Sequence, residues 1–183
     1  MKRAIALLLV LCAAPAAAQQ TVSANPALAV GTTKYMWELM TNFVTKAAEQ
    51  MPEADYAFRP THDVRTFGQL VGHVAGSQNL ICAAALGEKP GNEDDIEKST
   101  TTKAGLLAAL RASSQYCQRA YAQSDAASAG ATTLFGGPST RLRALVLNAT
   151  HNSEHYGNMV TYMRIRGMVP PSSQPAPPRT GTQ

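Results

Sequence analysis

Four stretches of the chain carry apolar residues at the spacing of an α-helix, and this pattern restricts the fold more than any other feature. The stretches run over about 25–50, 66–87, 102–124 and 139–166. In each, apolar side chains recur at every third or fourth position, so each helix has one face to bury. No stretch shows the alternation that is typical of a strand. Four amphipathic helices predict an all-α fold, a four-helix bundle.

Local signals indicate where these helices begin and end. Pro26 suits the first position of a helix that Asn25 caps. Thr66-x-x-Gln69 is a capping box, and Gly87 is expected to end the second helix. The residues expected to face the core are Met36, Trp37, Met40, Phe43, Val44 and Ala47, then Phe67, Leu70, Val71, Val74 and Ile81, then Leu106, Leu107, Leu110, Cys117 and Tyr121, and finally Leu142, Leu145, Val146, Ala149, Tyr156, Met159, Val160 and Met163.

Three segments between the helices are expected to be connections. Residues 55–65 have no helical period, residues 91–99 read as an acidic, exposed loop, and residues 124–137 are rich in Ala, Ser, Thr and Gly. After residue 171 the sequence is rich in Pro, Ser and Gln. We therefore expect a bundle domain over 19–171 and a disordered tail over 172–183.

The first 18 residues have the organisation of a secretory signal peptide. Lys2 and Arg3 precede an apolar run that is too short to span a bilayer, and Ala16 to Ala18 offer the small residues that a signal peptidase accepts. We expect cleavage before Gln19, so the protein would be exported, either to a periplasm or outside the cell, and would keep no membrane segment. A retained membrane anchor is the alternative.

The charge of the mature chain gives no sign of a nucleic-acid partner. The full sequence has 16 Lys and Arg against 12 Asp and Glu. Without Lys2 and Arg3 the balance is 14 against 12, a net charge of +2. No basic stripe with interleaved aromatic residues remains, so we expect no nucleic-acid binding.

Two cysteines, Cys82 and Cys117, remain in the mature chain. Export to an oxidising compartment makes them candidates for a disulfide. Two buried, unpaired thiols are the alternative.

The histidines supply the candidate site. His151 and His155 are four residues apart on the fourth helix, so their rings lie on one face and could chelate one ion. A random pair on a helix surface is common, but His73 lies on the inward edge of the second helix. Three buried imidazoles without partners would be costly, and one metal ion satisfies all three. His62, in a connection, is interpreted as a surface residue.

The sequence around these histidines resembles the DinB superfamily of small metal-binding bundles, which includes the YfiT-like proteins, to which hydrolase activity is ascribed. The matching stretches are Met51-Pro52-Glu53 with Tyr56-x-Phe58-Arg59-Pro60, Thr66-Phe67-Gly68-Gln69-Leu70-x-x-His73-Val74-Ala75, His151-x-x-x-His155-Tyr156-Gly157-Asn158, and Tyr162-Met163-Arg164-x-Arg166-Gly167-x-Val169-Pro170-Pro171. Asn158 stands where many members carry Gln.

The resemblance implies an up-down-down-up bundle in which the second and third helices run parallel. It implies that His73, His151 and His155 bind a divalent ion, zinc or nickel, with open positions completed by water, and that the protein is a homodimer. The parallel arrangement would place Cys82 and Cys117 at equal height, which suits a disulfide.

Three histidines with open coordination positions are typical of a catalytic rather than a structural metal site. Two interpretations stay open. The first is a metal-dependent enzyme, a hydrolase or a thiol-type transferase, acting on a small molecule that the sequence does not name. The second is a non-catalytic metal-binding or stress-associated bundle. Thiol cosubstrates implied by the resemblance are cytosolic, which export would put out of reach.

Overall fold

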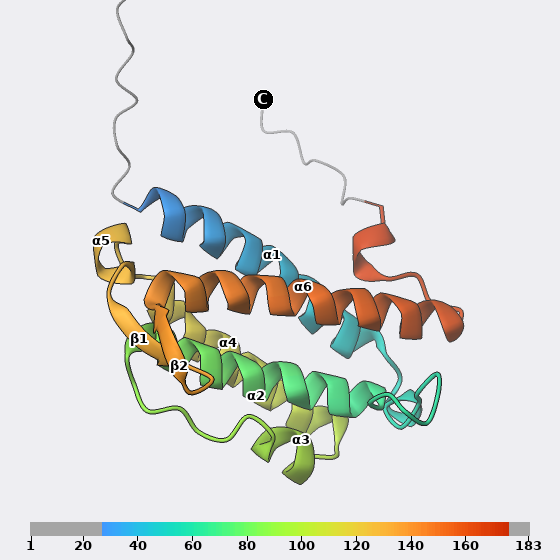
Figure 1. Cartoon of the computed structure of the whole chain (residues 1–183). Coiled ribbons are helices and arrows are strands. Elements are labelled where there is room, and N and C mark those ends of the chain that lie inside the picture. The colour runs from blue at the N-terminus through green and yellow to red at the C-terminus, as the bar shows by residue number, and fades with distance from the viewer. Residues whose placement is uncertain (1–26, 176–183) are drawn as a thin grey trace, which may run out of the picture.

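The computed structural model describes residues 27–175, and these form a bundle of four long helices with short elements between them (Figure 1). Asn25 and Pro26, the expected start of the first helix, lie outside the described residues, as do the signal segment and residues 176–183. No helix within 27–175 combines the length and the apolar character that crossing a membrane requires. The elements are α1 (Leu28–Gln50), η1 (Glu53–Asp55), α2 (Phe67–Leu86), α3 (Asp95–Ser99), α4 (Lys103–Ala120), α5 (Asp125–Ser128), β1 (Ala131–Leu134), β2 (Gly137–Thr140), α6 (Arg141–Ile165) and η2 (Pro171–Ser173).

Helices α2 and α4 run parallel, as the resemblance implied. Gln78 of α2 donates to Ser113 of α4 at 3.0 Å, and four residues further along each helix Cys82 and Cys117 are joined by a disulfide. Their Cα atoms are 5.3 Å apart, inside the range that a disulfide requires. Moving four residues towards the C-terminus of both helices leads from one contact to the next, so the two helices run in the same direction.

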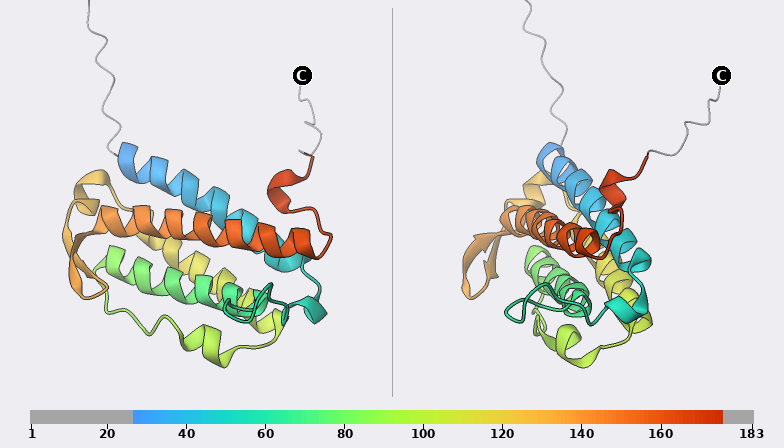
Figure 2. Two further views of the ribbon diagram at one scale, coloured as in Figure 1. Left: turned by 45° about the vertical axis from the view of Figure 1, so that its right-hand side comes forward. Right: turned by 90° about the vertical axis from the view of Figure 1, so that its right-hand side faces the viewer.

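Helices α1 and α6 form the second parallel pair. Asn152 donates to Thr41 at 2.9 Å, and a little further along both helices the rings of Phe43 and Tyr156 stack with centroids 5.1 Å apart. Figure 2 shows this pair lying over the pair α2 and α4, with α3 against the lower side of the bundle. The expected up-down-down-up topology is confirmed.

The local signals at the helix ends are largely confirmed. Thr66 accepts from the backbone N–H of Gln69 while the Gln69 side chain accepts from the backbone N–H of Thr66, which completes the capping box. Gly87 follows α2 with a φ of 73°, the left-handed conformation that glycine adopts without strain. Helix α4 ends at Ala120, earlier than expected, because Ser124 caps the separate turn α5.

The all-α fold class is confirmed, but a short hairpin is present although no stretch of the sequence shows the alternation of a strand. β1 and β2 form an antiparallel hairpin in which Leu134 pairs with Gly137. Its two turn residues, Phe135 and Gly136, have φ values of 51° and 77°, and positive φ at both positions matches the right-handed twist of a hairpin. The strands are four residues each and mostly solvent-facing, so they leave no apolar alternation to detect.

Other expectations need smaller corrections. The acidic segment 91–99 contains the helix α3, and it packs against α2 instead of standing free in solvent. Met36 and Val146 were expected in the core, but both are more than 40% exposed because they lie at the edges of their helical stripes. The ordered chain also continues past residue 171, since the hydroxyl of Tyr156 contacts Ser172 at 2.8 Å.

The apolar core has two parts with a polar layer between them. One part gathers around Met51, Phe67, Leu110 and Met163, and the other around Trp37, Ile81, Cys117, Tyr121 and Leu145. In the polar layer, fully buried Gln78 accepts from the indole of Trp37 at 2.9 Å and from Asn152 at 3.2 Å. Because its own amide donates to α4, Gln78 connects all four long helices and fixes their mutual register.

The end of the α2–α3 connection and the helix α3 pack on α2 at two glycines one turn apart. A Cβ added at Gly72 would lie 2.9 Å from the Cα of Glu97, and one at Gly76 would overlap the backbone carbonyl of Glu93. Glycine inside a helix costs about 0.5–1 kcal/mol of stability relative to alanine. The close backbone approach explains why glycine occupies both positions in spite of this cost. It lays residues 93–97 directly along α2.

Gly76→Ala is expected to destabilise the protein by about 1–3 kcal/mol, because the added methyl group must push the α2–α3 connection away from α2. Urea unfolding followed by circular dichroism measures the change. Gly157→Ala is the matched control, since a Cβ there meets no packed atom within 4 Å, and it should stabilise α6 by up to about 1 kcal/mol. Equal effects of the two substitutions would contradict the packing argument.

Candidate metal centre

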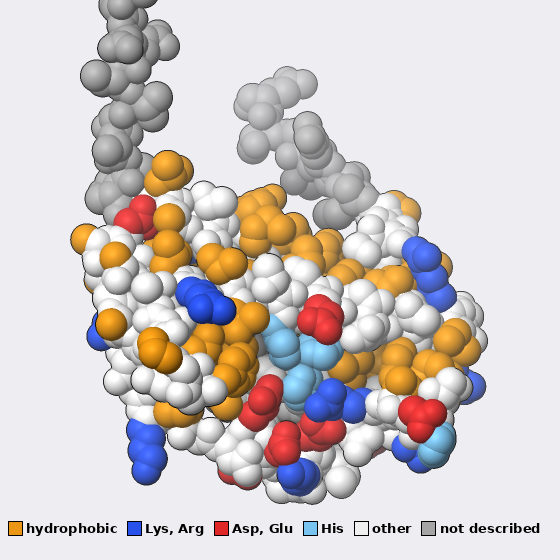
Figure 3. Space-filling view, in the orientation of Figure 1, with side chains coloured by type: hydrophobic (Ala, Val, Ile, Leu, Met, Phe, Trp, Pro, Cys, Tyr) orange, Lys and Arg blue, Asp and Glu red, His pale blue; other side chains and the backbone are white. Residues whose placement is uncertain are grey.

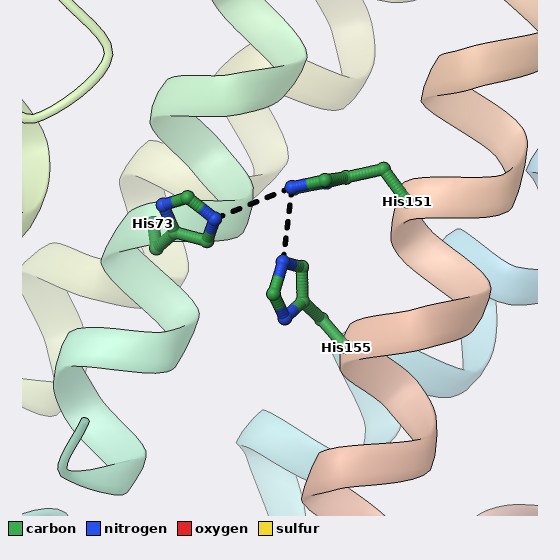
Figure 4. Close-up of side chains that lie close together, drawn as sticks. All are labelled: His73, His151 and His155. Carbon is green, nitrogen blue, oxygen red and sulfur yellow. Dashed lines mark hydrogen bonds between the residues drawn. The ribbon is translucent and has the colours of Figure 1, made fainter. Parts of the chain in front are cut away.

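The structure brings together the three histidines that the sequence selected. His73 comes from α2, and His151 and His155 come from successive turns of the antiparallel helix α6 (Figure 4). The Nε2 atom of His151 lies 3.2 Å from Nε2 of His73 and 2.9 Å from Nε2 of His155. All three rings thus point the same type of nitrogen at one place between the helices.

The surroundings keep these imidazoles neutral. His73 and His155 are 8% and 7% exposed, and His151 is half-buried. Burial lowers the pKa of each ring from 6.5 to about 4, and the positive charge of Arg65 acts in the same direction on all three. A neutral imidazole is the form that binds a metal ion, so the site is ready for one at neutral pH.

The donor set fits a divalent ion on two further observations. An ion about 2.1 Å from each nitrogen holds those nitrogens about 3.0–3.4 Å apart, close to the two Nε2 separations seen here. The Nδ1 atoms of His73 and His151 are buried without a hydrogen-bond partner among the described residues. Neutral rings that bind through Nε2 carry their proton on Nδ1, so both atoms then act as donors.

Charged residues that sequence reasoning missed lie beside the histidines. His73 Nδ1 is 3.8 Å from a carboxylate oxygen of Glu93 and 3.7 Å from one of Glu97. Arg65 donates from Nε to both oxygens of Glu97, at 3.1 Å each. Figure 3 shows the histidine side chains at the surface with acidic and basic side chains next to them. The signal that could have found them is the pair Gly72 and Gly76, because glycines one turn apart inside a helix indicate that another segment packs closely there.

Four other polar residues, on α6 or in the connection before α2, lie outside the set of converging nitrogens. His62 is exposed and faces Asp63 at 3.0 Å, as expected of a surface residue. Asn152 is buried in the polar layer, and Glu154 is exposed. The side-chain Nδ2 of Asn158 lies 3.3 Å from Nδ1 of His155, so Asn158 contacts the side of that ring away from the other histidines.

A pocket of about 680 Å³ opens beside the histidines. His155 lines it together with the polar residues Arg65, Asn158 and Tyr162, and Pro60, Val64 and Leu70 supply an apolar wall. Its size and mixed lining are typical of small-molecule sites. The site therefore has room for an organic molecule next to the converging nitrogens.

Solved structures with a similar fold have low sequence identity. A DinB-like protein from Bacillus cereus aligns with a TM-score of 0.67 and 17% identity, over 77% of this chain and 95% of its own. YfiT from Bacillus subtilis, described as a probable metal-dependent hydrolase with an unusual four-helix bundle topology, aligns with a TM-score of 0.60 and 17% identity, over 76% and 89%.

A mycothiol-dependent maleylpyruvate isomerase shares the fold over part of its length. Its TM-score is 0.59 at 16% identity, and the match covers 71% of this chain but 60% of the isomerase. A search of curated protein sequences found no significant match.

The sequence itself matches a family model. Residues 36–159, which include all three histidines, match the model of the DinB superfamily. The match extends over more than half of the chain and agrees with the bundle topology. The chain belongs to the DinB superfamily.

Proposed function

We propose that the protein is a metal-dependent hydrolase that acts on a small molecule. The observation that carries this proposal is the convergence of the three Nε2 atoms beside a pocket of about 680 Å³. A structural metal site is normally closed by four protein ligands, whereas three histidines leave positions open. Because His155 also lines the pocket, a substrate bound there would lie next to one of the three proposed ligands.

Each residue of the site has a definable part in such a reaction. His73, His151 and His155 would hold the ion, and a bound divalent ion supplies a Lewis acid and lowers the pKa of water towards about 7. The apolar wall of Pro60, Val64 and Leu70 would bind the carbon skeleton of the substrate. Asn158 would offer a hydrogen-bonding amide in the lining of the pocket, while the hydroxyl of Tyr162 donates to the backbone carbonyl of Arg65 at 2.6 Å and so holds the pocket wall together.

The proposal also covers which metal is bound, where the protein acts and how it assembles. Imidazole ligands suit zinc and nickel, and zinc or nickel is the ion that we propose. The signal segment supports export to a periplasm or the medium, and the resemblance to DinB bundles supports a homodimer. Export disfavours the thiol-type transferase, since the low-molecular-weight thiols that such enzymes use are cytosolic.

A non-catalytic metal-binding bundle is the second candidate. Asn158 and Thr161 are exposed on α6 and line the pocket, and polar groups in this position would suit the binding of a ligand without turnover. This candidate predicts a tightly held ion with no turnover of any substrate. Metal analysis combined with a hydrolysis assay separates it from the hydrolase.

Protein purified without a histidine tag is expected to hold about one divalent ion per chain, because three neutral imidazoles converge on one position. Elemental analysis measures the content. A panel of nitrophenyl esters and anilide amides then tests for hydrolysis by the zinc-loaded and the nickel-loaded protein. We expect hydrolysis that disappears when a chelator removes the ion and returns when zinc or nickel is restored.

His73→Ala is the control for the hydrolysis assay, and it should lose both the ion and the activity. Hydrolysis that persists in the metal-free protein would contradict the proposal. A full complement of metal without hydrolysis across the panel would favour the non-catalytic bundle.

A further inference from the structure

The metal ligand His73 has a buried proton donor with nothing to receive it. When Nε2 binds the ion, Nδ1 carries the proton, and this atom has no hydrogen-bond partner within residues 27–175. A buried donor without an acceptor costs about 1–3 kcal/mol. Since His73 is 8% exposed, water has little access to the ring. An acceptor must therefore come from the protein nearby.

Two carboxylates face this atom, Glu93 at the end of the α2–α3 connection and Glu97 in α3. An oxygen of Glu97 lies 3.7 Å from Nδ1 and an oxygen of Glu93 lies 3.8 Å from it. A displacement of about 1 Å brings either one to the 2.7–2.9 Å that is usual for a charge-assisted hydrogen bond. Both carboxylates reach the ring because Gly72 and Gly76 let their backbone lie against α2.

Glu97 is the better held of the two. Arg65 bonds both of its oxygens at 3.1 Å, and the Glu97 side chain is 14% exposed. The side chain of Glu93 is 27% exposed, and its one hydrogen bond among the described residues is with the hydroxyl of Ser77. Glu97 is therefore the less exposed and the more firmly held acceptor of the two.

We propose that Glu97 is the positioning residue of the metal centre: it accepts the Nδ1 proton of His73 and so holds Nε2 towards the ion. Carboxylates in this position fix the tautomer and orientation of a ligating histidine and raise its basicity. Arg65 holds Glu97 in place and also lines the pocket, so one chain of contacts joins the pocket wall to a metal ligand. The inference rests on the metal site of the proposed function.

Zinc affinity tests this inference, measured by competition with a chromogenic chelator. Glu97→Gln keeps the shape and an acceptor but removes the charge, and we expect about a 10-fold loss of affinity. Glu97→Ala removes the acceptor as well, and the loss should reach about 100-fold. Glu49→Gln is the matched control, because Glu49 is also a glutamate paired with an arginine, Arg111, and it lies outside the site. It should leave the affinity unchanged.

A second readout separates positioning from general stability. In zinc-loaded wild-type protein, nitrogen-15 NMR of the imidazoles should show a slowly exchanging Nδ1 proton on His73, and Glu97→Ala should broaden or abolish that signal. Urea unfolding of the metal-free variants checks that they remain folded.

Three outcomes count against the assignment. Unchanged zinc affinity in Glu97→Ala would overturn it while leaving the proposed function intact. A loss in Glu93→Gln as large as that in Glu97→Gln would also overturn it, since Glu93 would then share the role. Wild-type protein that binds no zinc would contradict the proposed function first, and this inference with it.

Discussion

His151→Ala is expected to lower the affinity for zinc or nickel by more than about 100-fold. Loss of a residue that only hydrogen-bonds to a metal ligand costs about 10-fold to 100-fold, and loss of a ligand itself should cost more. His151 is the central ligand of the three, since its Nε2 atom lies 2.9 Å from that of His155 and 3.2 Å from that of His73. Without it, two nitrogens on different helices remain. Chelator competition gives the affinity, and elemental analysis of the purified variant gives the occupancy.

The variant should stay folded, which makes the result interpretable. His151 is half-buried and belongs to neither apolar core, while the neighbouring Asn152 keeps its bonds to Thr41 and Gln78. His62→Ala is the control, because the His62 side chain is exposed and contacts Asp63 instead of any of the three ligands. One equivalent of tightly bound metal in His151→Ala would rule out the shared site.

The sequence was most informative about the long helices and their ends, which depend on local spacing. Helical periodicity placed the four long helices, and the capping box at Thr66 located the start of α2 to the residue. The four-residue step from His151 to His155 fixed their common face. His73 lies far from this pair in the sequence. It could still be assigned to the site, because the helical spacing of apolar residues in α2 shows which face of that helix points inward.

Features that depend on contacts between distant segments could not be read in the same way. Glu93 and Glu97 belong to an acidic stretch that looks solvated, and only the glycines at 72 and 76 show that it packs on α2. Gln78 lies inside an apolar helix face, and its partners come from three other helices. No local pattern encodes partners on three other helices at once, so the polar layer was not predicted.

Reduction of the Cys82–Cys117 disulfide is expected to lower the free energy of unfolding by about 3–4 kcal/mol. The bridge closes a loop with a sequence separation of 35, and the chain entropy that this removes from the unfolded state corresponds to that figure. The bridge also ties together two parallel helices, which must be linked by a long connection. Urea unfolding with and without dithiothreitol, on protein that has been equilibrated through the unfolded state, measures the difference.

Cys82→Ala/Cys117→Ala is the control, since its stability should not respond to dithiothreitol. The metal site gives an independent check, because the bridge lies in the core around Trp37 and Tyr121 while the histidines lie beyond the polar layer. Reduced but folded protein should therefore bind zinc with the affinity of the oxidised form. Equal unfolding free energies with and without dithiothreitol would mean that buried thiols pack as well as the bridge, and the disulfide would then contribute nothing to the stability of the bundle.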